Sequence, residues 1–206
     1  MVQQLLNQAS KIPSLLERFD IMRGSVEQAD LAAIETLCQD FRNTLKSLQE
    51  WESNQWLQTP SPLFWVKPTP ETAAPLDAKD LWFPDLMVAN SLTHCWAFKI
   101  IVKSHLGMLG TTLAARNEDN LERPLHLPSE SNTEISVATL AGMICDSMTY
   151  LLQPETKLFG PTSTFFTLLT AIQVFKGNPD EHSAQISRCQ QIVAQLAALG
   201  IRPPRM

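Results

Sequence analysis

The chain has 206 residues and a formal net charge of −5, with 16 Lys and Arg against 21 Asp and Glu. Because phosphate contacts need clustered Lys and Arg, and no basic run occurs, we expect no direct binding of nucleic acid through this chain. It is 44% hydrophobic and 18% charged, a globular balance that is long enough to bury a sizeable core, and no apolar stretch is long enough to span a membrane.

Residues 1–56 are predicted to be helical. Apolar residues follow helical spacing over residues 3–18, where Pro13 is expected to shorten or kink the helix. A longer amphipathic pattern covers residues 27–56, with an apolar residue every three or four positions.

Residues 57–84 form a proline-rich segment. We expect an extended connector here, held to the core by Phe64 and Trp65. No segment of the chain alternates polar and apolar residues for long enough to predict a strand.

Residues 85–200 are predicted to form the helical core. Residues 85–116 are the most apolar stretch, and apolar side chains surround much of it, which predicts a central helix buried on more than one side. The other predicted helices are 133–152, capped by Ser131 or Asn132, then 161–175, and then 179–199, closed by Gly200.

Together these elements predict an all-α fold. We expect one domain over residues 1–206, with six or seven helices around a buried central helix and a short tail at 201–206.

The four cysteines lie far apart in the chain, at Cys38, Cys95, Cys145 and Cys189, and no C-x-x-C pair occurs. This spacing excludes a zinc finger and favours buried free thiols in a reducing compartment. The first residues lack the features of a signal peptide, so we expect a protein of the cytoplasm or another reducing compartment that is not secreted.

No standard catalytic, phosphate-binding or dinucleotide motif is present, and the sequence indicates no cofactor. His94 and His105 are separated by about three helical turns, or roughly 16 Å, so one metal ion cannot hold both. We predict no metal site.

One candidate site is a polar cluster on the predicted central helix. Asn90, Thr93 and His94 share a helical face by their spacing of three and four residues. Such groups can orient a small molecule in an apolar pocket, or they can form an internal hydrogen-bond network. An internal network, or simply a stripe of polar residues exposed to solvent, is the plainer and favoured interpretation.

A second candidate is the pair Asp146 and Tyr150, four residues apart on the predicted helix 133–152. A carboxylate and a phenol on one face can act as acid and base. Such a pair more often ties a helix to a neighbouring loop, and we favour that interpretation.

The order of several short motifs resembles a known family. The series begins with Ser147 and Tyr150-Leu151-Leu152, continues with Gly160-Pro161, and ends in an apolar helix through Ala171 to Phe175. It resembles the C-terminal part of the regulatory region of fungal-specific transcription factors, the regulators with a six-cysteine binuclear zinc cluster. Thr167-Leu168 stands where that family commonly has Pro-Leu, and the zinc cluster is absent.

The resemblance implies an all-α regulatory domain, a nuclear location and a role in transcription. We expect a regulatory or effector-binding module of a fungal biosynthetic pathway, which lacks its own DNA-binding domain and binds a protein partner, a second copy of itself or a small hydrophobic effector. The alternative is a stand-alone protein or cyclase- or isomerase-like enzyme of secondary metabolism that binds a hydrophobic small molecule near Asn90, His94 and Tyr150. A pure dimerisation scaffold is a third hypothesis.

Overall fold

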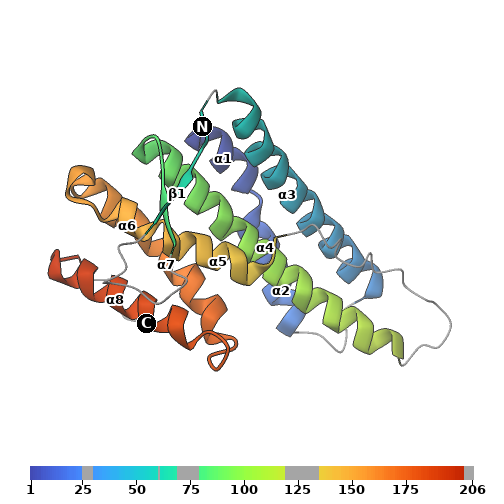
Figure 1. Cartoon of the computed structure of the whole chain (residues 1–206). Helices are drawn as coiled ribbons and strands as arrows, with labels where there is room; N and C mark the ends of the chain where they lie inside the picture. Colours follow the sequence, from blue (N-terminus) through green and yellow to red (C-terminus); the bar gives the residue numbers. More distant parts are fainter. Residues whose placement is uncertain (25–29, 60, 69–78, 119–134, 202–206) are drawn as a thin grey trace.

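Two long antiparallel helices lie side by side through the middle of the molecule (Figure 1). They are α3 (Leu31–Gln58) and α4 (Leu86–Glu118). Helix α4 packs against α3 on one side and against α5 and α7 on another. It corresponds to the predicted central helix.

The computed structural model is helical over 79% of the residues that it describes. The predicted all-α class is therefore confirmed. The described residues are 1–24, 30–59, 61–68, 79–118 and 135–201.

The N-terminal helices α1 (Val2–Ala9) and α2 (Ile12–Gly24) cover one side of α3. Pro13 is the second residue of α2, and the first turn of a helix tolerates proline because its N–H groups have no partner within the helix. The predicted helix over residues 3–18 is thus two helices.

The C-terminal helices lie on the opposite side of α4 (Figure 1). Their last member ends as predicted: Gly200 has a φ of 77°, and the N–H of Ile201 donates to the carbonyl of Leu196. These elements are α5 (Val137–Asp146), α6 (Met148–Leu151), the 3₁₀ turn η1 (Pro154–Thr156), α7 (Phe159–Lys176) and α8 (Ser183–Ala198).

The predicted helix over residues 133–152 differs from the structure. Helix α5 begins at Val137, and the Oγ atom of Ser136 caps it by accepting from the N–H of Thr139 at 3.0 Å. The expected caps Ser131 and Asn132 lie outside the described residues. The helix also stops at Asp146, and the chain resumes as α6 after Ser147.

The proline-rich segment contains two short strands that the sequence did not predict. Strands β1 (Trp65–Pro68) and β2 (Lys79–Trp82) pair antiparallel, with Trp65 opposite Trp82. Phe64 contacts Phe83 and Trp96 as an anchor of this segment, whereas Trp65 is exposed, which corrects its predicted role. Strands of four residues are too short for an alternation pattern to reveal.

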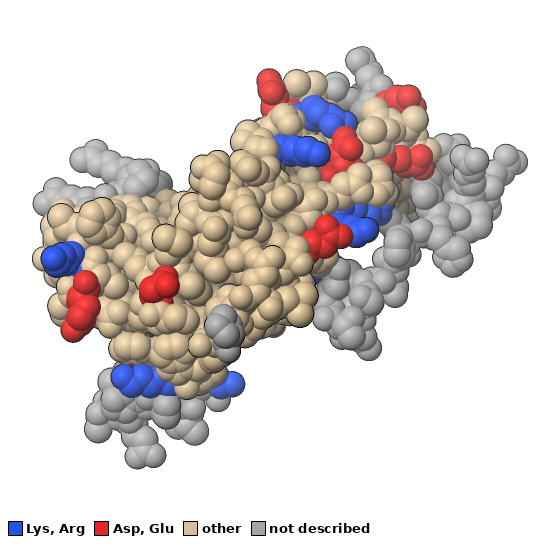
Figure 2. Space-filling view, turned by 90° about the horizontal axis from the view of Figure 1, so that it is seen from above, with Lys and Arg blue, Asp and Glu red and all other residues tan. Residues whose placement is uncertain are grey.

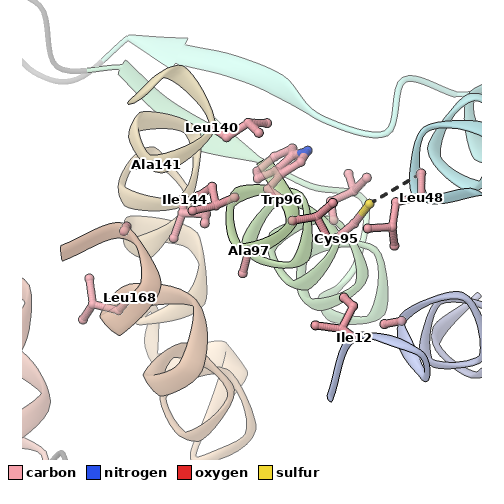
Figure 3. Close-up of a cluster of buried hydrophobic side chains, with 14 of the residues drawn as sticks. Ile12, Leu48, Cys95, Trp96, Ala97, Leu140, Ala141, Ile144 and Leu168 are labelled. Carbon is pink, nitrogen blue, oxygen red and sulfur yellow. Dashed lines mark hydrogen bonds between the residues drawn. The ribbon is translucent and has the colours of Figure 1, made fainter. Parts of the chain in front are cut away.

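Helix α4 is enclosed on opposite sides. Cys95, Trp96 and Ala97 follow one another in the chain and are all fully buried, which requires neighbours on more than one side of the helix. Figure 3 shows Leu140 and Ile144 of α5 on one side of α4, with Leu48 of α3 on the other.

One buried ion pair crosses from α4 to α3. The Nζ atom of Lys99 bonds to the Oε2 atom of Glu52, and the indole N–H of Trp96 donates to Oε1 of the same carboxylate at 2.8 Å. Both oxygens of Glu52 therefore have a partner, which offsets the cost of removing these charges from water. The pair allows a lysine to lie in the buried part of α4.

The close approach between α7 and the turn before it requires glycine at position 160. A Cβ atom there would lie 2.1 Å from the carbonyl oxygen of Leu151 and 2.4 Å from Oγ1 of Thr156. These two atoms are already joined by a hydrogen bond of 2.9 Å. An added side chain would break this contact or push α7 away.

We therefore predict that Gly160→Ala lowers the free energy of unfolding by about 3 kcal/mol, as overpacking does in a closely packed site. Gly142→Ala is the matched control, since nothing lies within 4 Å of a Cβ atom there. Within helix α5 this control should raise stability by about 0.5–1 kcal/mol. Urea unfolding of both variants measures the difference, and equal effects would contradict the packing argument.

Candidate functional site

The five predicted site residues occupy separate environments. Asn90, Thr93 and His94 lie on α4, whereas Asp146 and Tyr150 lie at the end of α5 and on α6. Among the described residues, no hydrogen bond, ion pair or ring contact joins the α4 residues to Asp146 or Tyr150. The structure therefore does not unite them in one pocket.

Asn90 and His94 lie together where α4 meets α7. The hydroxyl of Ser163 donates to Oδ1 of Asn90 at 2.7 Å. The imidazole of His94 stacks on Phe166, with ring centroids 5.8 Å apart, and its edge approaches Phe98. Two residues of the predicted cluster thus share one half-buried surface with α7.

The protonation of His94 follows from its position. Burial lowers the pKa of His94 below its ordinary value, and the hydrogen bond to the carbonyl of Asn90 opposes this only in part. The ring is therefore neutral at pH 7, with its Nδ1–H donated to that carbonyl at 2.7 Å. The lone pair of Nε2 has no hydrogen-bond partner among the described residues.

Thr93 does not share the face of its neighbours. It is buried, and its hydroxyl donates to the carbonyl of Ala89 at 2.9 Å. The prediction of one common face is wrong for Thr93, because the spacing of three residues turned it inward rather than toward α7. This bond within its own helix meets the hydrogen-bonding need of the buried hydroxyl.

Apolar side chains surround Asn90 and His94 at the surface. Met87 precedes Asn90 by one turn on α4, and Phe159 and Phe166 flank Ser163 on α7 at helical spacing. Met87 is 59% exposed, Phe159 75% and Phe166 38%. We call the set formed by Met87, Asn90, His94, Phe159, Ser163 and Phe166 the His94 surface.

Asp146 is part of an ionic link between three elements. Arg188 of α8 bonds through Nη1 to Oδ1 of Asp146 and through Nη2 to Oδ1 of Asp80, the latter at 3.3 Å. Thr149 donates to the same oxygen of Asp80 at 2.8 Å. Arg188 therefore joins α8 to the end of α5 and to strand β2.

Burial raises the pKa of Asp146 above its ordinary value, although Arg188 opposes the shift by its charge and its hydrogen bond. The nearby Asp80 raises this pKa further. The carboxylate is thus held in a structural tie, which is the favoured interpretation of the sequence.

Tyr150 lies on α6, which follows the end of α5 after Ser147. Its ring packs edge-on against Trp82 and Phe83, with centroids 5.6 and 5.3 Å away. Burial and the charge of Asp85 raise the pKa of its phenol. Asp146 and Tyr150 thus have different partners, and the raised pKa keeps the phenol protonated at neutral pH.

All four cysteines are free and buried, as the sequence predicted. Cys145 of α5 and Cys189 of α8 approach to 3.3 Å between their sulfur atoms. The hydrogen bond with Cys189, together with burial, raises the pKa of Cys145 well above its usual range. Burial also raises the pKa of Cys95, to about 12, so this thiol is unreactive at neutral pH.

Several residues of these sites carried no usable sequence signal. Arg188 and Asp80 are separated by more than one hundred residues along the chain, and Ser163 lies far from Asn90. Phe159 and Phe166 share a helical face with Ser163, but that pattern matches an ordinary core stripe. Only tertiary contacts identify them.

Charge is scattered over the surface. On the face seen in Figure 2, Lys and Arg lie in small separate groups, several beside Asp or Glu, with wide uncharged areas between them. Among the described residues, no group of three His, Cys, Asp or Glu side chains could hold a metal ion. No helix within the described ranges is long and apolar enough to cross a membrane.

Comparisons with models of protein families, with curated proteins and with solved structures found no match for this chain.

We predict that Arg188→Leu lowers the free energy of unfolding by about 2 kcal/mol at pH 7, because it leaves two half-buried carboxylates without their shared cation. The loss should be smaller at pH 4. A raised folded-state pKa means that the folded protein binds the proton of Asp146 more readily, so stability falls as pH rises above 3.8, and removing Arg188 enlarges that fall.

Urea unfolding at pH 7 and pH 4 measures the loss in the free energy of unfolding at each pH. Lys46→Leu is the control, since Lys46 forms a weak exposed pair with Glu50 at 3.8 Å and should cost less than about 0.5 kcal/mol at either pH. A loss for Arg188→Leu that is the same at pH 4 and pH 7 would show that the charges do not couple.

Proposed function

We propose that this chain is a regulatory module of the transcription-factor type, which acts by binding a protein partner or a small hydrophobic effector. It would work in the nucleus, in the control of a fungal biosynthetic pathway, without DNA contacts of its own. The ordered motifs from Ser147 to Phe175 motivate the family assignment, and the helical fold agrees with it.

The His94 surface is the observation that supports binding as the mode of action. It exposes three large apolar side chains, of which Phe166 stacks on His94, and Nε2 of His94 is an acceptor without a partner among the described residues. Exposed apolar surface of this kind, with a few polar groups inside it, is typical of binding sites.

The state of the other candidate residues also favours binding over catalysis. Thr93 is bonded to its own helix, Asp146 is paired with Arg188, and Tyr150 packs among aromatic rings with a raised pKa. None of these three groups is placed to transfer a proton to a bound molecule.

A transcriptional assay tests the proposal. The chain fused to an unrelated DNA-binding domain should change the expression of a reporter in a fungal host by at least severalfold. Phe166→Glu, which places a charge on the His94 surface, should remove the effect, because burying an unpaired carboxylate in an apolar contact is costly.

Leu57→Glu is the matched control, since Leu57 is 83% exposed at the end of α3. The proposal fails if the fusion leaves the reporter at the level of the DNA-binding domain alone, or if both variants behave alike.

The state of His94 favours a second candidate, an enzyme that acts on a hydrophobic metabolite. Its neutral imidazole has an available Nε2 lone pair beside the rings of Phe98 and Phe166. That arrangement would suit a general base in an isomerase or cyclase.

Purified protein incubated with hydrophobic cyclic metabolites, followed by chromatography and mass detection, tests this candidate. His94→Ala should lower turnover by at least about 100-fold if the imidazole is the base, whereas His182→Ala should leave it unchanged. Absence of turnover, or equal turnover by both variants, would reject the enzyme.

A further inference from the structure

A polar hollow lies between α1 and the second half of α3, away from the His94 surface. Its volume is about 280 Å³. The residues that line it are dominated by carboxamides, with one aromatic side chain among them: Gln4, Gln8, Asn54, Gln55, Gln58 and Trp51. We call this set the amide hollow.

Gln55 is the most informative residue of the amide hollow. It is only 7% exposed, yet its carboxamide has no hydrogen-bond partner in the described part of the chain. Among the described residues, the polar side-chain atoms that lack both a partner and contact with solvent belong to Trp51, Trp82 and Ser91. The polar atoms of Gln55 are not in this group, so they keep some contact with solvent. The carboxamide of Gln55 therefore opens onto the hollow.

A nine-tenths buried carboxamide with no partner is unusual, because buried polar groups are nearly always hydrogen-bonded. Water can satisfy it in the free protein. A ligand that supplies both a donor and an acceptor at this point would satisfy it equally well and would release that water.

The other lining residues specify the chemistry of such a ligand. Each of the five carboxamides offers two N–H donors and an acceptor oxygen, with no net charge. The only charged side chain in the lining is Glu50, which is exposed and paired with Lys46. The hollow therefore suits an uncharged molecule that carries many hydroxyl groups, since each hydroxyl both donates and accepts.

Trp51 adds an apolar wall. It lies one turn before Gln55 on α3 and is 5% exposed, so its indole is held firmly in the core. The C–H faces of a sugar ring are apolar while its hydroxyls are polar, and a lining of one aromatic edge with several carboxamides matches both.

A second hollow of about 250 Å³ continues the first toward α2. The two share Gln8 and Ser47. The second is lined mainly by amides and hydroxyls, and its Arg18 and Asp40 neutralise each other in an ion pair of 2.6 Å. Its lining also includes Leu15 and the exposed Lys11. The groove thus has room for a second sugar unit.

We propose that the groove between α1–α2 and α3 binds a neutral polyhydroxylated ligand of one or two sugar units, with Gln55 as its buried hydrogen-bonding residue. The site differs from the hydrophobic His94 surface in place and in chemistry. It does not depend on the proposed role in transcription, and a direct binding measurement tests it separately.

Calorimetric titration of the purified chain with D-glucose, D-galactose, D-mannose, maltose and cellobiose tests the site. At least one of these sugars should bind with a Kd of about 1 mM or tighter. Gln55→Met keeps the length of the side chain but removes its polar atoms, and it should raise the Kd for that sugar by about five- to tenfold. Gln8→Leu changes an exposed residue and should raise the Kd as well.

Gln190→Met is the matched control, because Gln190 is an exposed glutamine of α8 that lines neither hollow. It should leave the Kd unchanged. Octanoate and inorganic phosphate serve as apolar and charged probes and should not compete with the sugar. The proposal is overturned if no sugar binds more tightly than about 10 mM, if Gln8→Leu and Gln55→Met both bind as the control does, or if octanoate or phosphate displaces the sugar.

Discussion

Helix α4 can exist in this form only because helices enclose it on opposite sides, and the other elements take their places from that requirement. Three consecutive buried residues, Cys95 to Ala97, bury more than half of the circumference of the helix, and the His94 surface occupies the remaining face. The α1–α3 group covers one side and the C-terminal helices cover the other (Figure 1). Lys99 lies in the same stretch, and it is tolerated because Glu52 of α3 pairs with it while also accepting from Trp96. The main packing contact between the two long helices thus carries a specific polar bond, which fixes their register as well as their distance.

Polar contacts have a similar positioning role on the C-terminal side. Arg188 holds α8 against Asp146 and Asp80, and the hydrogen bond from Thr156 to Leu151 holds the turn that Gly160 approaches. In these contacts the carboxylate of Asp146 and the hydroxyl of Thr156 already have hydrogen-bond partners within the protein. The surfaces proposed for binding lie on either side of α4: the apolar His94 surface with α7, and the polar groove between α3 and the first two helices. The two surfaces differ in chemistry, so the two proposals can be tested independently.

The candidate site could be predicted from the sequence only in part, and the failures have physical causes. Spacing placed Asn90 and His94 on one face correctly, because four residues are close to one full turn. Thr93 was misplaced, since helical spacing does not say which side the core covers. The helix that the pattern continued is also divided at Ser147. Gln55 carried no signal at all. It follows Trp51 at core spacing, and nothing local shows that α1 leaves its carboxamide open to a hollow.

The sequence by itself determined the helical class, the apolar central helix, the buried thiols and the C-terminal cap at Gly200. These depend on periodicity, composition and backbone preferences, which act over a few neighbouring residues. The tertiary structure decided the short β1–β2 pairing, the partners of Lys99 and Arg188, and the two binding surfaces. Each of these joins residues far apart in the chain, and which distant side chains meet depends on how all the helices pack around α4.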